Sequence, residues 1–137
     1  MRLLSRILRP RLEVTAHCDL PCGVYDPAQA RYEAESVLAM QKKYQDNDDP
    51  VYRTRAIFIK EQRADVCKHH LWVLWTDYFK PPHFEKYPQL HELINKATKA
   101  AGGGPGGAKS SMDPATGEQL LQHIAEIEKI FWETKAA

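Results

Sequence analysis

Apolar residues recur at spacings of three and four in several parts of the chain, which predicts amphipathic helices. We expect helices at about 26–45, 51–79 and 87–100, and a fourth that opens at 114. The residues expected to face the interior are Ala30, Ala34, Val37, Gln41 and Tyr44, then Ile59, Val66, Val73 and Leu74, then Leu90, Leu93, Ile94 and Ala97, and finally Leu120, Leu121, Ile124, Ile127, Ile130 and Phe131.

Turn-forming and capping residues separate these segments. Asp26-Pro27 and Asp113-Pro114 each combine an N-cap carboxylate with a proline suited to the first helical turn. The acidic cluster 46–49 stops the first helix, and Pro81-Pro82 ends the second. Residues 101–112, which are rich in glycine, are expected to form a flexible linker. The fold class is therefore predicted as all-α, an antiparallel four-helix bundle formed by residues 17–137 as one domain.

The segment before the first helix carries the candidate chemistry. His17, Cys18 and Cys22 place one imidazole and two thiols within six residues, which is typical of a metal site. If the chain were cut before His17, the new α-amine, the Cys18 amide nitrogen and the two sulfurs would form an N2S2 plane, with the imidazole as an axial ligand. Such a plane favours nickel or copper over tetrahedral zinc, and nickel(II) is the better fit.

Residues 1–16 are predicted to be a processing segment. They hold four of the 19 basic and one of the 18 acidic residues, so the remainder has a net charge of −2 and the whole chain +1. Neither net charge favours a nucleic-acid partner. The sequence has no stretch of about 18 apolar residues, so it predicts no membrane span. Arginine and proline interrupt the hydrophobic stretch that a secretion signal needs, which argues against export by that route. An organelle transit peptide stays open as an alternative. Three cysteines, an odd number, fit a reducing compartment.

The run from His17 to Tyr25 resembles the nickel hook of the nickel superoxide dismutase family. The likeness continues through residues 26–31, 59–63, 77–88, 113–117 and 130–135, and so covers nearly all of 17–137. The resemblance implies a four-helix bundle with an N-terminal hook (17–25) that binds one nickel ion. It also implies disproportionation of superoxide to dioxygen and hydrogen peroxide by a Ni(II)/Ni(III) centre. A dedicated protease would remove the propeptide (1–16), and the mature protein would be a cytoplasmic homohexamer.

The resemblance also implies roles for individual residues. Tyr25 would cover the open axial face as a gate, although it could instead be a core tyrosine. Glu33 and Arg63 would hold the axial imidazole through its free ring nitrogen, the alternative being an ordinary interhelical salt bridge. Three further residues belong to the predicted site: Asp19, which would cap the hook or join the substrate channel, Pro21, which would be cis, and Lys80, which would attract the anion.

Two other functions stay open from the sequence. A nickel or copper carrier would use the same ligands without redox cycling, and a thiol-disulfide switch would use Cys18 and Cys22 as a pair. The switch leaves His17 without a role. Cys67, in the middle of a helix, is expected to be a small buried residue rather than a ligand.

Overall fold

The structure is a computed structural model that describes residue 20 and residues 22–137. The helices are α2 (Ala28–Gln45), α3 (Pro50–Val73), the π-helix η1 (Leu74–Tyr78), α4 (Pro81–Lys86), α5 (Leu90–Ala100) and α6 (Pro114–Ala136). The described residues contain no strand, and the predicted all-α class is confirmed.

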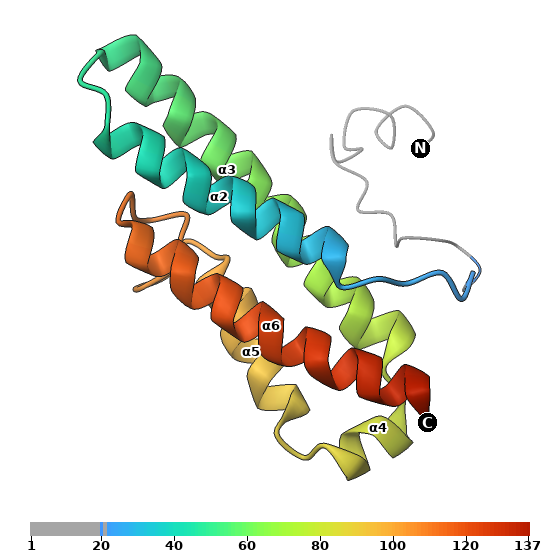
Figure 1. The fold of residues 1–137 in the computed structure, drawn as a ribbon. Coiled ribbons are helices and arrows are strands. Elements are labelled where there is room, and N and C mark those ends of the chain that lie inside the picture. Colours follow the sequence, from blue (N-terminus) through green and yellow to red (C-terminus); the bar gives the residue numbers. More distant parts are fainter. Residues whose placement is uncertain (1–19, 21) are drawn as a thin grey trace, which may run out of the picture.

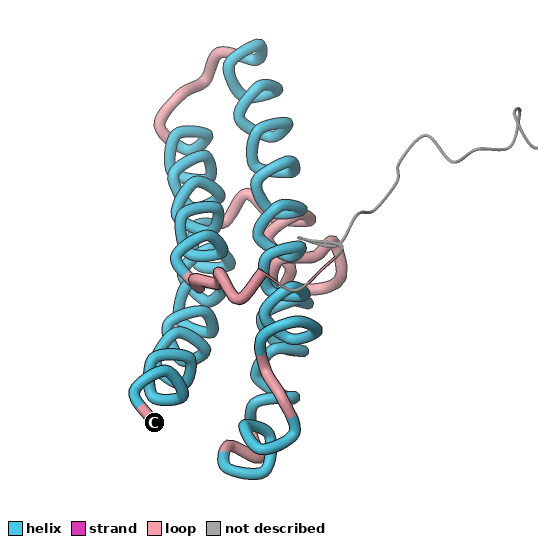
Figure 2. Tube along the Cα trace, turned by 90° about the vertical axis from the view of Figure 1, so that its right-hand side faces the viewer, coloured by secondary structure: helices cyan, strands magenta, loops and turns pink. Residues whose placement is uncertain are grey.

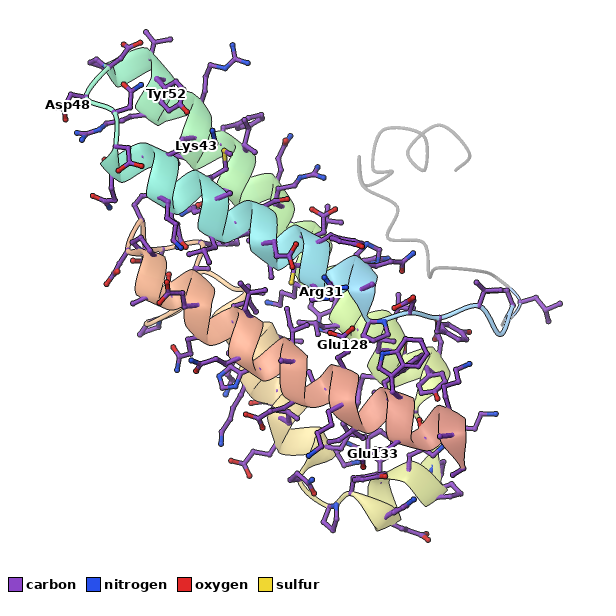
Figure 3. The ribbon with its side chains drawn as sticks, in the orientation of Figure 1. Arg31, Lys43, Asp48, Tyr52, Glu128 and Glu133 are labelled. Atoms are coloured by element: carbon purple, nitrogen blue, oxygen red, sulfur yellow. The ribbon has the colours of Figure 1, made fainter. Side chains whose placement is uncertain are left out.

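The four long helices form an elongated bundle (Figure 1). α2 packs against both α3 and α6, and α5 packs against α6 and α3, so the four helices surround a main hydrophobic core. Consecutive long helices run in opposite directions, and the view turned by 90° shows the same side-by-side packing (Figure 2). Figure 3 shows Arg31 of α2 and Glu128 of α6 lying toward each other, where Nε and Oε2 are 3.3 Å apart.

Aspartate carboxylates cap the first turns of three helices, and two of these caps were predicted. Asp26 Oδ1 accepts a hydrogen bond from the Ala28 amide at 2.8 Å, and Asp113 Oδ1 accepts one from the Ala115 amide at 3.0 Å. Asp49, predicted only as part of a stop signal, also caps α3, because its Oδ1 accepts from the Val51 amide at 3.1 Å. Each carboxylate pairs an amide that the first helical turn leaves without a partner.

The interior faces of α2, α5 and α6 match the prediction closely, but that of α3 differs. Leu90, Leu93, Ile94 and Ala97 of α5, for example, are all buried. In α3, Ile59 was expected inside and is 36% exposed, whereas Lys60 beside it is buried. Val73 and Leu74 are buried as expected, but the apolar spacing misplaces the first part of the face, where the buried residues are small or, at Lys60, polar. Its buried residues are Ala56, Lys60, Ala64, Cys67, Leu71 and Val73.

The end of the second helix also departs from the prediction. A helix was expected without interruption to residue 79, but its last turn widens into η1, where the Phe79 amide donates to the Leu74 carbonyl at 2.9 Å. Pro81-Pro82 then opens the short helix α4 instead of a simple turn. The third long helix consequently begins at Leu90, three residues later than expected. Wide turns of this kind often re-aim side chains at functional sites.

Residues 101–112 connect α5 to α6 and fold back onto the bundle. The Ala108 amide donates to the Ala100 carbonyl at 2.7 Å, and the buried Lys60 ammonium donates to the Lys109 and Ser111 carbonyls at 2.6 and 3.2 Å. Ala101 and Ala108 are fully buried. The flexibility expected of this linker stays a prediction, while its contacts tie it to α3.

Candidate metal centre

The continuous described part of the hook begins at Cys22. Its side chain is exposed, and its sulfur accepts a hydrogen bond from the Val24 amide at 3.4 Å. Gly23 follows with a φ of +74°, a left-handed conformation that glycine adopts without steric cost. The backbone therefore turns sharply next to the thiol and presents the sulfur at the surface. An exposed thiol is accessible to a metal ion.

The other predicted residues of the hook are His17, Cys18, Asp19 and Pro21, and they lie outside the described residues. Cys22 is thus the one predicted ligand that the structure describes. Residue 20 and residues 22–137 contain no cluster of three or more His, Cys, Asp or Glu side chains arranged to bind a metal.

Tyr25 lies at a pocket of about 510 Å³ where the hook meets the end of α3. Its half-buried ring packs on the core and lies 5.8 Å from the Tyr78 ring at 56°. The pocket is lined by Gly23, Tyr25, Asp77, Tyr78, Lys80, His83 and Lys135. The fold thus brings Tyr25 and Lys80, which are 55 positions apart, to one cavity. Figure 1 shows the hook end, α4 and the C-terminus gathered at the same end of the bundle.

Cationic and aromatic groups share the wall of this pocket. The Lys135 ammonium lies 5.2 Å from the centre of the Tyr78 ring, a cation–π contact. The Lys80 amide donates to His83 Nδ1 at 3.2 Å. Burial, together with the charges of Lys80 and Lys86, lowers the pKa of His83. Near neutral pH His83 is therefore uncharged, and because Nδ1 accepts, its proton is on Nε2.

Glu33 and Arg63 form the predicted pair between α2 and α3. Arg63 Nη1 donates to Glu33 Oε1 at 3.3 Å and lies 3.2 Å from Oε2. Glu33 Oε2 is buried and accepts no hydrogen bond from any described residue. A buried carboxylate oxygen with unused acceptor capacity calls for a donor. The pair is therefore arranged to receive one more N–H group.

Cys67 lies close to this pair and, unlike Cys22, is not exposed. It is fully buried, as predicted, and burial together with the negative charge of Glu33 raises the pKa of its thiol to about 12. The thiolate is the form that binds metals and reacts. Cys67 therefore stays protonated and inert at neutral pH.

Four lining residues had no role in the sequence interpretation: Asp77, Tyr78, His83 and Lys135. Asp77 and Tyr78 reach the pocket through the wide turn η1, and Lys135 comes from the last turn of α6. No spacing rule links residues so far apart. The signal that could have found them is their presence in the two matched segments, 77–88 and 130–135.

A family model described as nickel-containing superoxide dismutase matches residues 12–135. The chain belongs to this family. It is 64% identical to a protein named Superoxide dismutase [Ni] from Streptomyces coelicolor and 63% identical to one from Streptomyces seoulensis, in both cases over 135 residues that make up 98% of this chain and all of the relative. A solved native nickel superoxide dismutase is 66% identical, with a TM-score of 0.83 over 88% of this chain and 100% of its own.

Family membership confirms the predicted enzyme class and cofactor, a superoxide dismutase that depends on nickel. The described residues fit that metal. Cys22 offers an exposed sulfur, and the free acceptor on Glu33 suits the ring N–H of a histidine ligand. No helix in residues 22–137 has the length and apolar character needed to cross a bilayer.

Proposed function

We propose that the chain disproportionates superoxide at a nickel centre built by its own N-terminal segment after residues 1–16 are removed. The observation that carries the proposal is the exposed Cys22 thiol beside a cation-lined pocket, in a member of the nickel-containing family. When bound, nickel supplies a couple that alternates between the divalent and trivalent states. With that couple, one superoxide would be oxidised to dioxygen by loss of one electron, and a second would be reduced to hydrogen peroxide by that electron and two protons.

His17, Cys18 and Cys22 would hold the metal. The α-amine and imidazole of His17, the Cys18 amide nitrogen and the two thiolates would be the donors. Soft thiolates exclude hard ions such as magnesium. Pro21 and Gly23 would shape the turn that returns Cys22 to the metal, and the positive φ of Gly23 supports this assignment.

Glu33 and Arg63 would orient the imidazole of His17. The unused acceptor, Glu33 Oε2, supports this role, since the ring N–H would complete its hydrogen bonding. Arg63 holds the same carboxylate in place, since its Nη1 donates to Glu33 Oε1 at 3.3 Å and lies 3.2 Å from Oε2. A histidine held in this way has one tautomer and one orientation, which tunes its strength as a ligand.

Tyr25 would limit access to the metal, because its half-buried ring packs on the core and lines the pocket. Asp19 would cap the amides of the hook or border the same channel. Lys80, with Lys135 across the pocket, would raise the capture rate of an anionic substrate. The neutral His83 leaves that positive charge to the two lysines.

The comparisons also support removal of residues 1–16. The Streptomyces coelicolor relative matches over its full length and covers 98% of this chain. The solved native chain also matches over its full length but covers only 88% of this chain, which is the share that residues 17–137 make up. A dedicated protease would make the cut. Exposed tryptophans (Trp72, Trp75 and Trp132) support a homohexamer, in which such side chains would be covered. The odd number of cysteines supports a cytoplasmic location.

The deciding experiment compares the full chain with the chain that begins at His17, each loaded with nickel. The full chain is expected to be nearly inactive, because residue 17 then has an amide nitrogen instead of an amine. Equal activity of the two forms would contradict the role of the new terminus. Electron paramagnetic resonance should detect trivalent nickel in the trimmed form. Zinc as the sole metal in protein from the native host would contradict the redox function, and metal without turnover would favour a carrier.

A further inference from the structure

Tyr78 lies at the centre of the aromatic wall of the pocket. Its ring is 4.3 Å from that of Phe131, 5.8 Å from that of Tyr25 and 5.7 Å from that of His83, with which it stacks at 24°. The ring is thus packed between the hook and α6. Its hydroxyl makes one further contact, to Thr134 Oγ1 at 2.7 Å.

The direction of that hydrogen bond follows from the next one. Thr134 Oγ1 donates to the Phe131 carbonyl at 2.6 Å, and a threonine hydroxyl has a single hydrogen. Thr134 therefore accepts from Tyr78, and the order of donation is Tyr78 to Thr134 to the backbone of α6. The phenol hydrogen of Tyr78 is directed into the bundle.

We propose that Thr134 is a positioning residue that fixes the hydrogen-bond polarity of Tyr78 in the superoxide pocket. The inference rests on the proposed function. With its hydrogen committed to α6, the Tyr78 oxygen can only accept hydrogen bonds from groups in the pocket. Tyr78 then supplies no proton to the nascent peroxide, and the two protons come from other donors. The last turn of α6 thereby becomes part of the site.

The first test is a double-mutant cycle on the nickel-loaded, trimmed enzyme. Thr134→Val keeps the shape and removes the hydroxyl, whereas Thr134→Ser keeps the hydroxyl. We expect Thr134→Val to lower turnover about fivefold, the order of one lost hydrogen bond, and Thr134→Ser to restore it. In a Tyr78→Phe background Thr134→Val should have no further effect. An equal loss in both backgrounds would mean that Thr134 acts through the stability of α6, and would overturn the proposal.

The second test does not depend on activity. In the nickel-free full chain labelled with 13C at tyrosine Cζ, the Tyr78 resonance is identified by its loss in Tyr78→Phe. Thr134→Val should shift that resonance and Thr134→Ser should leave it in place. An unchanged resonance in Thr134→Val overturns the proposal even if the protein is an active dismutase. If Thr134→Val does not fold, Tyr78→Phe alone should lower turnover by a similar factor, and full activity of that variant would equally overturn it.

Discussion

Lysine side chains at the two ends of the bundle differ in burial and in role. At the hook end, Lys80 and Lys135 are exposed on the rim of a pocket with aromatic walls. Toward the other end, Lys60 is 1% exposed and its ammonium donates to two backbone carbonyls of the loop before α6. Figure 1 shows that this loop lies near the far ends of α2 and α6, away from α4 and the C-terminus. A lysine whose donors are satisfied by carbonyls stabilises the fold, whereas an exposed one contributes to the field around the site.

This difference implies that the two ends can be perturbed separately. Changes at the hook end should alter turnover and leave the free energy of unfolding nearly unchanged. Changes around Lys60 should do the reverse. The four variants below test that separation, beginning with the largest expected effect.

Cys22→Ser should abolish turnover in the trimmed, nickel-loaded protein. An alcohol is a poor donor to nickel. The loss of turnover should therefore exceed the roughly 10–100-fold loss that follows removal of a residue hydrogen-bonded to a metal ligand. Superoxide consumption and nickel content measure it. Cys67→Ala is the matched control, since that buried thiol stays protonated with a pKa of about 12. Activity in Cys22→Ser, or its loss in Cys67→Ala, would mean that the wrong sulfur has been assigned.

Glu33→Gln should reduce nickel affinity or turnover by roughly 10–100-fold, because a neutral amide holds the histidine ligand less firmly. Isothermal titration with nickel and stopped-flow kinetics would measure the two effects. Glu35→Gln is the control on the same helix, where Glu35 pairs with Arg31 at 3.2 Å on the surface. Similar losses in both variants would point to a general charge effect instead of a hydrogen bond to the metal ligand.

Lys60→Met should lower the free energy of unfolding by about 2 kcal/mol, because two carbonyls lose a charged hydrogen-bond donor while the apolar stem is kept. Urea denaturation of the nickel-free protein measures this change. Turnover per folded molecule should stay the same. The exposed Lys99→Met should change stability by less than about 0.5 kcal/mol. Unchanged stability in Lys60→Met would show that the cost of burying the ammonium cancels its hydrogen bonds.

Lys80→Gln should have the smallest effect, a fall of about threefold in kcat/KM at low ionic strength. The difference from the unmodified enzyme should shrink as salt is added, since screening removes the attraction of the anion. Lys135→Gln should act in the same direction, and Lys99→Gln should not. A loss in Lys80→Gln that is independent of salt would argue against steering and for a local structural role.

Helix positions were readily predicted from the sequence, because capping residues and apolar spacing are local signals. Asp113 caps α6 as expected, and the buried face of α5 was identified residue by residue. The face of α3 was identified only at its end, at Val73, because Lys60 is buried through hydrogen bonds to carbonyls about fifty positions away. The wide turn η1 and the helix α4 were not predicted, because Pro81-Pro82 was interpreted only as the end of the second helix.

The composition of the hook, and through it the metal and the family, was determined by the sequence alone, since the predicted donors lie within a few residues of one another. The surroundings of the site depend on tertiary structure. Only the fold brings Tyr25, Lys80 and Lys135 to one pocket, leaves Glu33 with an unused acceptor and directs the Tyr78 hydroxyl to Thr134. The physical reason is the separation of the residues along the chain. Chelation joins residues that are close in sequence, whereas burial and electrostatic fields depend on which helices pack together.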